Sequence, residues 1–421
     1  MTRTRAYAIV LAAVVVPRAV VLASERETIL TGLVEKSDRF ARTLVESGTF
    51  GFIAGRPSAN TQPLYGWFLA GLYELFERHW LVVGIAQIGV AAATALLVLE
   101  IGRRVASLAV GTVGAVIASV HPFLVWHDVH VNREILDGLL AAVVVLLALL
   151  VAERRGALLA LGLGGAAGLA ILGNARLALL PLVLAAFVAW PFRPPRPSIL
   201  LAGAVLVGAL LVVSPWMARN QAQLGCLTIT TDARALWKAN NENTFDVLDR
   251  GGWIDDVPEP VGGPPWPELA ADLTLAGQPT EADECEQAGY YRDLVLDFWR
   301  DHPGEKARLA AQAARMLWSP TFSVESGDRG GFAGLARDVV EPLFMLVVYA
   351  LAVAGAFLVP RRFLVLVLLL VGYNTLLATA FAGTVRYRVP FDFLLAVLAA
   401  ATLFRAWDVV RTRRARVATP A

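Results

Sequence analysis

Long runs of apolar residues follow one another along most of this chain, and short polar stretches separate them. A helix of about 20 residues crosses the hydrocarbon core of a bilayer, which is about 30 Å thick. The pattern therefore predicts about ten membrane-spanning helices, at residues 6–24, 80–102, 107–125, 134–152, 157–173, 176–192, 198–214, 337–358, 363–381 and 389–405. The predicted fold class is an all-α polytopic membrane protein.

Arginines in the turns between these runs predict the orientation of the chain. They form small clusters, such as Arg103–Arg104, Arg154–Arg155 and Arg361–Arg362. Basic turns stay on the cytoplasmic side, and every cluster lies inside if the N-terminus does. We therefore expect a protein of the cell membrane with both termini in the cytoplasm. No small-residue cleavage site follows the first run, so we expect a retained anchor rather than a signal peptide.

Two segments without a spanning run, 25–79 and 216–336, are predicted to lie outside. Residues 63–76 in the first are apolar and aromatic but too short to cross, which predicts a helix lying in the membrane interface. The second segment has the length of a small domain, or of a cap of helices and loops above the bundle. The chain then divides into residues 1–215, 216–336 and 337–421.

Two local features of the chain bear on its packing. Cys226 and Cys285 both fall in the second outer segment. An oxidising exterior permits a disulfide between them, although their spacing does not give their distance. Gly164 and Gly168 lie in an apolar run with no strand before it, so we expect them to let two helices approach closely rather than to bind a nucleotide.

Composition supports a membrane protein. Of the 421 residues, 57% are hydrophobic and 17% are charged, against roughly a quarter charged in soluble domains. We expect the lipid bilayer as the surroundings of the chain and no nucleic acid as a partner. The unusual polar residues all fall on the predicted outer side, which predicts one shared site there: Asp38, Arg56, Tyr65, the turn 127–134, Asn174, Arg176, Arg219, Asn220 and 386–388.

Five short motifs carry a resemblance over nearly the whole chain. They are Ser37-Asp38, Gln62-Pro63-Leu64-Tyr65, Pro215-Trp216-x-x-Arg219-Asn220, Leu236-Trp237-x-x-Asn240-Asn241 and Arg386-Tyr387-Arg388-Val389-Pro390. In this order and on this side of the membrane, they resemble the GT-C membrane glycosyltransferases. Within that group the chain is most similar to the bacterial branch related to protein O-mannosyltransferases and lipid A aminoarabinose transferases.

The resemblance implies a polyprenyl-phosphate sugar as donor and an inverting transfer on the outer face. It also implies that Asp38, in the first outer loop, is the general base. Many members of the group have an Asp-Glu pair at this place, whereas this chain has Ser37-Asp38-Arg39. This departure weighs against a metal at the loop and leaves the role of a base open.

The chemistry of such a transfer predicts roles for the outer arginines. Displacing a sugar from a phosphate requires a base near the acceptor hydroxyl and cations that hold the leaving phosphate. Arginine suits the second task because its planar fork matches phosphate oxygens and stays charged when poorly solvated. We expect Arg386 and Arg388 to bind the donor phosphate, followed by Arg219, Arg176 and Arg56.

Further residues on the same side are expected to line the substrate cavity: Tyr65, Glu134, Asn220, Trp237, Asn240 and Tyr387. His127 and His130 are spaced to share a helical face and are the candidates for a metal site. Their spacing is loose for metal ligands, so a divalent metal is conceivable but not favoured, and we expect no other cofactor.

The sequence leaves several functions open. A hexosyl- or pentosyltransferase acting on an envelope glycan, lipid or protein is favoured. A ligase or polymerase of lipid-linked glycans shares the donor type and the side of the membrane. A lipid or glycan transporter or flippase also keeps polar residues near a cavity, but it typically shows internal repeats or broken helices near the midplane. We see no obvious repeat.

Overall fold

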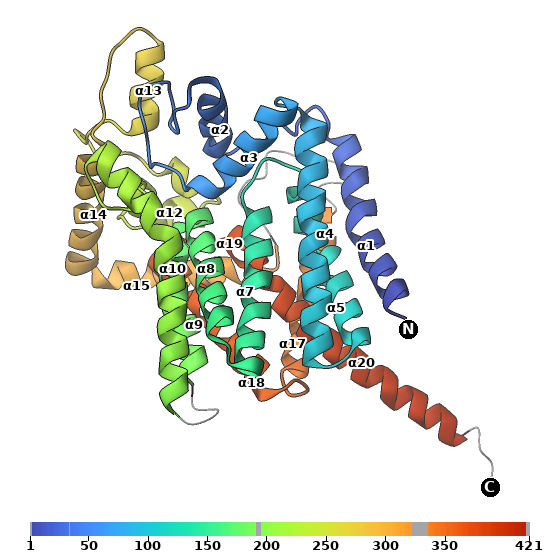
Figure 1. Cartoon of the computed structure of the whole chain (residues 1–421). Helices are drawn as coiled ribbons and strands as arrows, with labels where there is room; N and C mark the ends of the chain where they lie inside the picture. The colour runs from blue at the N-terminus through green and yellow to red at the C-terminus, as the bar shows by residue number, and fades with distance from the viewer. Residues whose placement is uncertain (1, 33, 191–194, 322–335, 418–421) are drawn as a thin grey trace.

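The computed structural model describes residues 2–32, 34–190, 195–321 and 336–417, and this part of the chain is helical with no strands. Each predicted span coincides with helical structure, as Figure 1 shows. The helices that correspond to the spans are α1 (Arg3–Ser24), α4 (Trp80–Val105), α5 (Leu108–Ser119), α7 (Glu134–Arg154), α8 (Ala157–Gly173), α9 (Leu180–Ala189), α10 (Pro195–Leu224), α17 (Glu341–Gly355), α18 (Arg361–Ala380) and α20 (Asp392–Val417). The predicted all-α architecture is confirmed.

Not every predicted span has the length to cross a bilayer alone. Within the described ranges, seven helices are long and apolar enough. The spans predicted at 107–125, 157–173 and 176–192 form shorter apolar helices instead. α5 stops at Ser119 because Pro122 starts a separate short helix, α6 (Pro122–His127). The third is divided into a 3₁₀ turn, η1 (Ala175–Leu179), and α9, with Pro181 in the first turn of α9.

Small residues allow a close contact between α8 and α10 in the bundle. A Cβ added to Gly164 of α8 would lie 2.0 Å from the backbone oxygen of Val205 on α10. One added to Gly168 would lie 2.9 Å from the oxygen of Ala209 on the same helix. Two backbones this close have no room for a larger residue. The predicted role of both glycines in helix packing is confirmed.

The first outer loop folds into two helices at one end of the bundle, α2 (Lys36–Ser47) and α3 (Pro63–Phe76). In Figure 1 they lie at the end away from the C-terminus. Gly48 ends α2 in the left-handed conformation, with φ of 72°, and Pro63 occupies the first turn of α3, where no backbone donor is needed. These helices, the start of α7 and the short α19 (Val385–Arg388) border the site described below.

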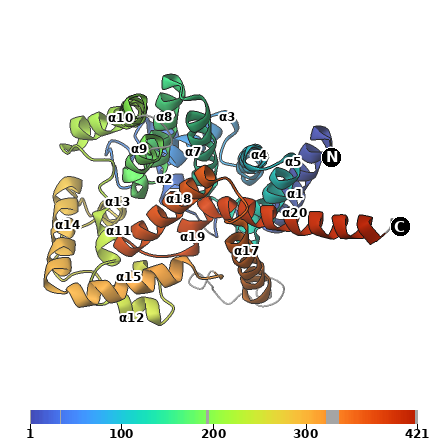
Figure 2. The same ribbon diagram turned by 90° about the horizontal axis from the view of Figure 1, so that it is seen from below.

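The second outer segment contains α11 (Ala233–Lys238), α12 (Thr244–Asp249), η2 (Ile254–Asp256), α13 (Pro267–Leu275), α14 (Glu284–Asp301) and α15 (Pro303–Leu317). Figures 1 and 2 place α14 and α15 at the flank of the bundle, not over its end as a cap. Lys306 on α15 donates to the oxygens of Thr379 (2.8 Å) and Ala380 (3.3 Å), the last residues of α18. The segment is therefore fastened to the end of a spanning helix. The 3₁₀ turn η4 (Val389–Phe391) and a π-helical turn, Ala336–Val340, complete the described elements.

Cys226 and Cys285 form a disulfide across a sequence separation of 59 residues. It joins the C-terminal end of α10 to the start of α14. Closing a loop of this length stabilises the folded segment by about 4 kcal/mol in the chain-entropy model. We expect Cys226→Ser to make the outer segment more sensitive to limited proteolysis, and Cys285→Ser to have the same effect. The double variant should match the reduced wild type, whereas wild-type resistance in either variant would contradict a stabilising role.

Candidate functional site

Arg386 connects three parts of the chain that are distant in sequence. Its Nη2 lies 2.6 Å from Oε1 of Glu35 and 3.0 Å from Oε1 of Glu134. Glu35 precedes α2, Glu134 opens α7, and Arg386 is on α19. The side chain of Glu134 is 2% exposed and that of Arg386 is 14% exposed. Two carboxylates and one guanidinium therefore meet in a nearly dry space where α2, α7 and α19 come together.

Arg133, Asp137 and Arg176 extend this group. Arg133 donates from Nη1 to Gln62 (2.7 Å), and Asn174 donates to Oδ2 of Asp137 (3.0 Å). The guanidinium of Arg176 lies 3.6 Å from the ring centroid of Tyr387, a cation–π contact. We call these residues the central cluster: Glu35, Arg133, Glu134, Asp137, Arg176 and Arg386.

The charges of the central cluster interact in a low-dielectric setting. Burial and the neighbouring Glu134 carboxylate raise the pKa of Glu35, while Arg133 and Arg386 oppose the shift. Two buried oxygens accept no hydrogen bond, Oε2 of Glu134 and Oδ1 of Asp137. Buried polar atoms are normally paired, so these oxygens are available to a ligand or to water. The cluster thus holds both acids that can accept a proton and cations that can hold an anion.

Asp38 is buried beside this cluster, with both carboxylate oxygens already engaged. Oδ1 accepts from the Tyr73 hydroxyl (2.6 Å) and from Nε of Arg78 (2.9 Å), and Oδ2 accepts from Nη2 of Arg78 (3.1 Å). Burial and the Asp38 charge raise the pKa of Tyr73, so its phenol stays a donor. The sequence predicted no site role for Tyr73 or Arg78. Their only signal was an aromatic stretch with a basic residue just after it.

Tyr65 and Tyr387, expected in the substrate cavity, both lie near the central cluster. Tyr65 is buried on α3 and donates to Gln87 (2.6 Å), which in turn donates to the backbone oxygens of Asp128 and His130. Burial raises the pKa of Tyr65 well above its ordinary value. Tyr387 lines a small cavity with Asp137, Asn174 and Arg176. These two tyrosines and Glu134 are the expected cavity residues that the structure brings together.

Arg388 points to a different carboxylate from Arg386. Its Nε donates to Asp392 (3.0 Å), and its Nη1 donates to the backbone oxygens of Leu317 (2.8 Å) and Ser319 (2.6 Å). Nε2 of His121 lies 3.3 Å from the same Asp392 carboxylate. These contacts connect α20 with the end of α15, so the structure gives Arg388 several protein partners.

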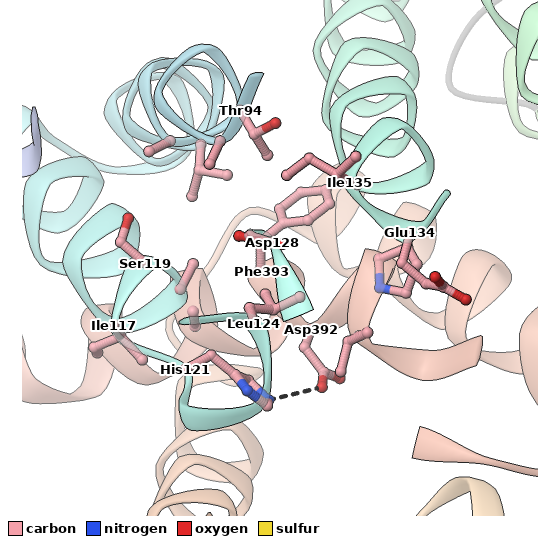
Figure 3. A pocket seen from close by; sticks show the side chains of 18 of the residues that line it. Thr94, Ile117, Ser119, His121, Leu124, Asp128, Glu134, Ile135, Asp392 and Phe393 are labelled. Atoms are coloured by element: carbon pink, nitrogen blue, oxygen red, sulfur yellow. Dashed lines mark ion pairs between the residues drawn. The ribbon is translucent and has the colours of Figure 1, made fainter. Parts of the chain in front are cut away.

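A mainly apolar cavity of about 60 Å³ opens next to this pair and reaches Glu134 at its edge (Figure 3). Polar residues gather on its walls, among them His121, Asp128 and Asp392, whereas α4, α5 and α17 contribute apolar side chains. Asp128 is neutralised by Arg18 of α1 at 2.6 Å. Glu134 therefore belongs to the central cluster and also lines this cavity.

The other predicted site residues lie in the contacts of the outer segment. Arg219 donates to the backbone oxygens of Ser58 (3.0 Å) and Phe50 (3.2 Å), and Arg56 donates to that of Thr280 (2.7 Å). Asn220 donates to the oxygen of Thr228 (2.8 Å), Trp237 packs against Tyr291 with ring centroids 5.4 Å apart, and Asn240 accepts from Trp299 (2.9 Å). The structure does not bring these five residues into the central cluster.

The histidines considered for a metal stack on aromatic rings. The His127 and Phe123 ring centroids are 3.9 Å apart, and those of His130 and Trp126 are 3.8 Å apart. Nδ1 of His130 lies 2.8 Å from the oxygen of Trp126. Among the residues that the structure describes, no group of three or more His, Cys, Asp or Glu side chains is placed to hold a metal ion.

Comparison with known proteins relates part of the sequence and the whole fold to glycosyltransferases. Residues 57–218 match the family model described as dolichyl-phosphate-mannose-protein mannosyltransferase. No curated protein matches the sequence.

Solved structures resemble the chain over nearly its full length. The apo oligosaccharyltransferase of Archaeoglobus fulgidus aligns with a TM-score of 0.52 and 13% identity, over 96% of this chain and 51% of that protein. The same oligosaccharyltransferase with an inhibitory peptide and a dolichol-phosphate gives 0.53 and 13%, over 98% and 52%. ArnT from Cupriavidus metallidurans bound to undecaprenyl phosphate gives only 0.43, with 17% identity over 93% and 78%.

At these identities the structural likeness shows the fold alone. The chain spans about half the length of the oligosaccharyltransferase it matches. The resemblance to GT-C membrane glycosyltransferases predicted from the sequence is thus confirmed, by the fold of the chain as a whole and by the mannosyltransferase family model over residues 57–218.

Proposed function

We propose that this chain is a membrane glycosyltransferase that moves a sugar from a polyprenyl-phosphate donor to an envelope glycan, lipid or protein. The observation that carries the proposal is the central cluster, in which three carboxylates and three guanidiniums come together under α2 and α3, Glu134 and Asp137 buried and the other four half-buried. Charges buried in this number are costly unless they serve a polar ligand or a reaction. A sugar transfer from a phosphate uses both signs of charge.

Two comparisons support a lipid phosphate as the donor. The matching family model is described by its dolichyl-phosphate-mannose substrate, and an oligosaccharyltransferase of similar fold holds a dolichol-phosphate. The buried arginines of the central cluster supply the charge that such a phosphate requires. The sugar transferred is a hexose or a pentose.

For an inverting transfer, Glu134 is the base that the geometry favours. Its Oε2 accepts no hydrogen bond, and the residue borders a cavity. Both oxygens of Asp38 already accept hydrogen bonds from Arg78, whereas Oε2 of Glu134 accepts none. We therefore assign the base to Glu134 and a positioning role to Asp38. Asp38 as the base, expected from the sequence, stays a prediction that the same assays test.

The proposed site faces the exterior, with both termini in the cytoplasm. The disulfide at the outer end of α10 supports this side because disulfides persist in oxidising compartments. The basic residues Arg103, Arg104 and Arg154 support it as well, because they end α4 and α7 at the opposite side of the bundle.

Lipids from cells that lack the protein provide the test. We expect these cells to accumulate a polyprenyl-phosphate sugar, identified by mass spectrometry of total lipid extracts. Purified wild-type protein added to the extract with cell-envelope acceptor should consume this lipid and release polyprenyl phosphate. The proposal fails if no such lipid accumulates and if purified protein consumes no polyprenyl-phosphate sugar.

A further inference from the structure

A cleft outside the central cluster lies between the first outer loop and the second outer segment. It measures about 230 Å³, against about 60 Å³ for the cavity in Figure 3. Its walls come from the loop around Arg56, the end of α10, α13 and the start of α14. Two of the lining residues, Gln223 and Asp283, are exposed, so the cleft is reachable from outside the protein. A space of this size admits a sugar ring, whereas a single water needs only roughly 10–15 Å³.

Charged side chains in the walls of the cleft keep part of their hydrogen-bonding capacity. Arg56 makes its hydrogen bonds through Nη1, to the hydroxyl of Thr274 (3.2 Å) and the backbone oxygen of Thr280 (2.7 Å). Its Nε and Nη2 have no partner among the described residues. Asp283 accepts from two backbone N–H groups of α14 through Oδ1, each at 2.9 Å. In the described part of the chain, no donor reaches its Oδ2, so both side chains can bind a ligand.

Glu284, at the start of α14, is a buried carboxylate in the wall of the cleft, and it is 8% exposed. Its Oε2 accepts from the backbone N–H of Ala59 (2.9 Å) and from the hydroxyl of Thr231 (2.7 Å). Its Oε1 accepts no hydrogen bond from the residues that the structure describes. Buried carboxylate oxygens normally have a donor. Glu284 therefore holds the loop wall with one oxygen and leaves the other for a ligand that can donate.

The charges in the walls of the cleft favour a neutral ligand with hydroxyl groups. Arg56 is a cation, whereas Asp283 and Glu284 are acids, so an anion and a cation would each meet a like charge. Hydroxyl groups can donate to the two carboxylates and accept from the guanidinium. The lining alanine and proline side chains of α13 add an apolar surface for the C–H groups of a sugar ring. A neutral sugar combines all of these properties.

The cleft is connected to α2, which borders the central cluster. Arg39 on α2 donates from Nε to the backbone oxygen of Phe52 (3.0 Å), which lines the cleft, and from Nη1 to Asp272 of α13 (2.8 Å). Figure 1 shows α13 and α2 at the same end of the bundle. The disulfide fixes two further walls, because it joins the end of α10 to the start of α14. A ligand therefore meets a preformed cleft, which lowers the entropy cost of binding.

We propose that this cleft binds a neutral sugar residue of the acceptor, which makes the acceptor a glycan. This inference rests on the proposed function, which leaves the acceptor open among glycan, lipid and protein. The sugar in the cleft is not the one that reacts, because another residue of the same glycan supplies the attacking hydroxyl. Binding of such a remote part holds the acceptor for the reaction. Arg56, expected from the sequence to bind the donor phosphate, then contacts the acceptor instead.

The probe is neutral polysaccharide from the envelopes of cells that lack the protein, after protease digestion and lipid extraction. Its binding to purified full-length protein is measured without donor. We expect Ala282→Trp, which fills the cleft without removing a side-chain hydrogen bond, to weaken binding about 10-fold or more. Gln223→Ala removes one exposed polar group of the wall and should weaken binding by about 2- to 10-fold. Ala311→Trp, at an exposed position on α15, is the matched control and should bind as wild type does.

Three results would overturn the inference. The first is the absence of polysaccharide binding by wild type, whether or not it consumes donor. The second is equal affinity of wild type, Ala282→Trp and Gln223→Ala for the polysaccharide. The third is binding of the protein fraction of the same envelopes in place of the polysaccharide, which would make a peptide the occupant of the cleft. Failure of the proposed function is separate, because it appears as the absence of donor consumption by wild type.

Discussion

Replacing Glu134 with glutamine is expected to lower kcat for sugar transfer by about 10²- to 10⁴-fold, the usual contribution of a general base. Glutamine keeps the size of the side chain and an oxygen that can accept from Arg386, but it cannot take a proton. The bond between Nη2 of Arg386 and Oε1 of Glu134, 3.0 Å long, can therefore persist in the variant. The measurement is initial-rate transfer with saturating polyprenyl-phosphate sugar.

The reason for this large effect is the state of Oε2 of Glu134. That oxygen is buried and accepts no hydrogen bond from the protein, so it can accept one from a substrate hydroxyl. The acceptor hydroxyl must reach it through the neighbouring cavity, which Glu134 borders.

Asp38→Asn is the matched comparison, because it also replaces a carboxylate with an amide, at a residue outside the central cluster. If Asp38 only positions α2 against α3, this variant should lose thermal stability through the weakened Arg78 contact and keep more activity than Glu134→Gln. The opposite ranking, with Glu134→Gln near wild-type rate and Asp38→Asn inactive, would return the role of base to Asp38.

Hydrophobic pattern and arginine position were sufficient to predict the bundle. Each predicted span coincides with helical structure because a run of apolar residues in lipid has few alternatives to a helix. The packing role of Gly164 and Gly168 was also predictable, because small residues four positions apart on one helix face let a second helix approach closely. The lengths were less certain, because Pro122 and Pro181 shorten elements that hydropathy treats as continuous.

The partners of each polar side chain were beyond the sequence. Glu35 and Asp38 are three residues apart, close to one turn of helix, yet Glu35 reaches Arg386 while Asp38 reaches Arg78. The Glu35–Arg386 contact joins residues 351 positions apart. From the sequence, Arg56 and Arg219 were expected to bind phosphate, as Arg176 was. The fold shows that both donate hydrogen bonds to backbone oxygens instead. The sequence identifies the charged side chains, but the packing of the helices determines which of them are left to bind a ligand.

Arg18→Met is expected to destabilise the protein by about 3–5 kcal/mol, the usual cost of removing one partner of a buried ion pair. Arg18 donates from Nε and Nη2 to one oxygen of Asp128, at 2.8 and 2.6 Å, and from Nη1 to the oxygen of Ser119 at 2.8 Å. Both side chains are at most 5% exposed. The substitution leaves the Asp128 carboxylate buried without its counter-ion. The thermal unfolding midpoint of purified protein in one detergent measures the loss.

The double variant Arg18→Met, Asp128→Asn separates the charge from the packing. With both charges removed, nothing ionised is left buried between α1 and the turn after α6, so most of the lost stability should return. Met also refills part of the space beside the 60 Å³ cavity, which limits the packing defect. If the double variant is as unstable as Arg18→Met alone, the contacts of Arg18 with Ser119 and the surrounding helices matter more than the ion pair. In that case α1 is held by packing, and the unfolding midpoint of Asp128→Asn alone should stay close to that of wild type.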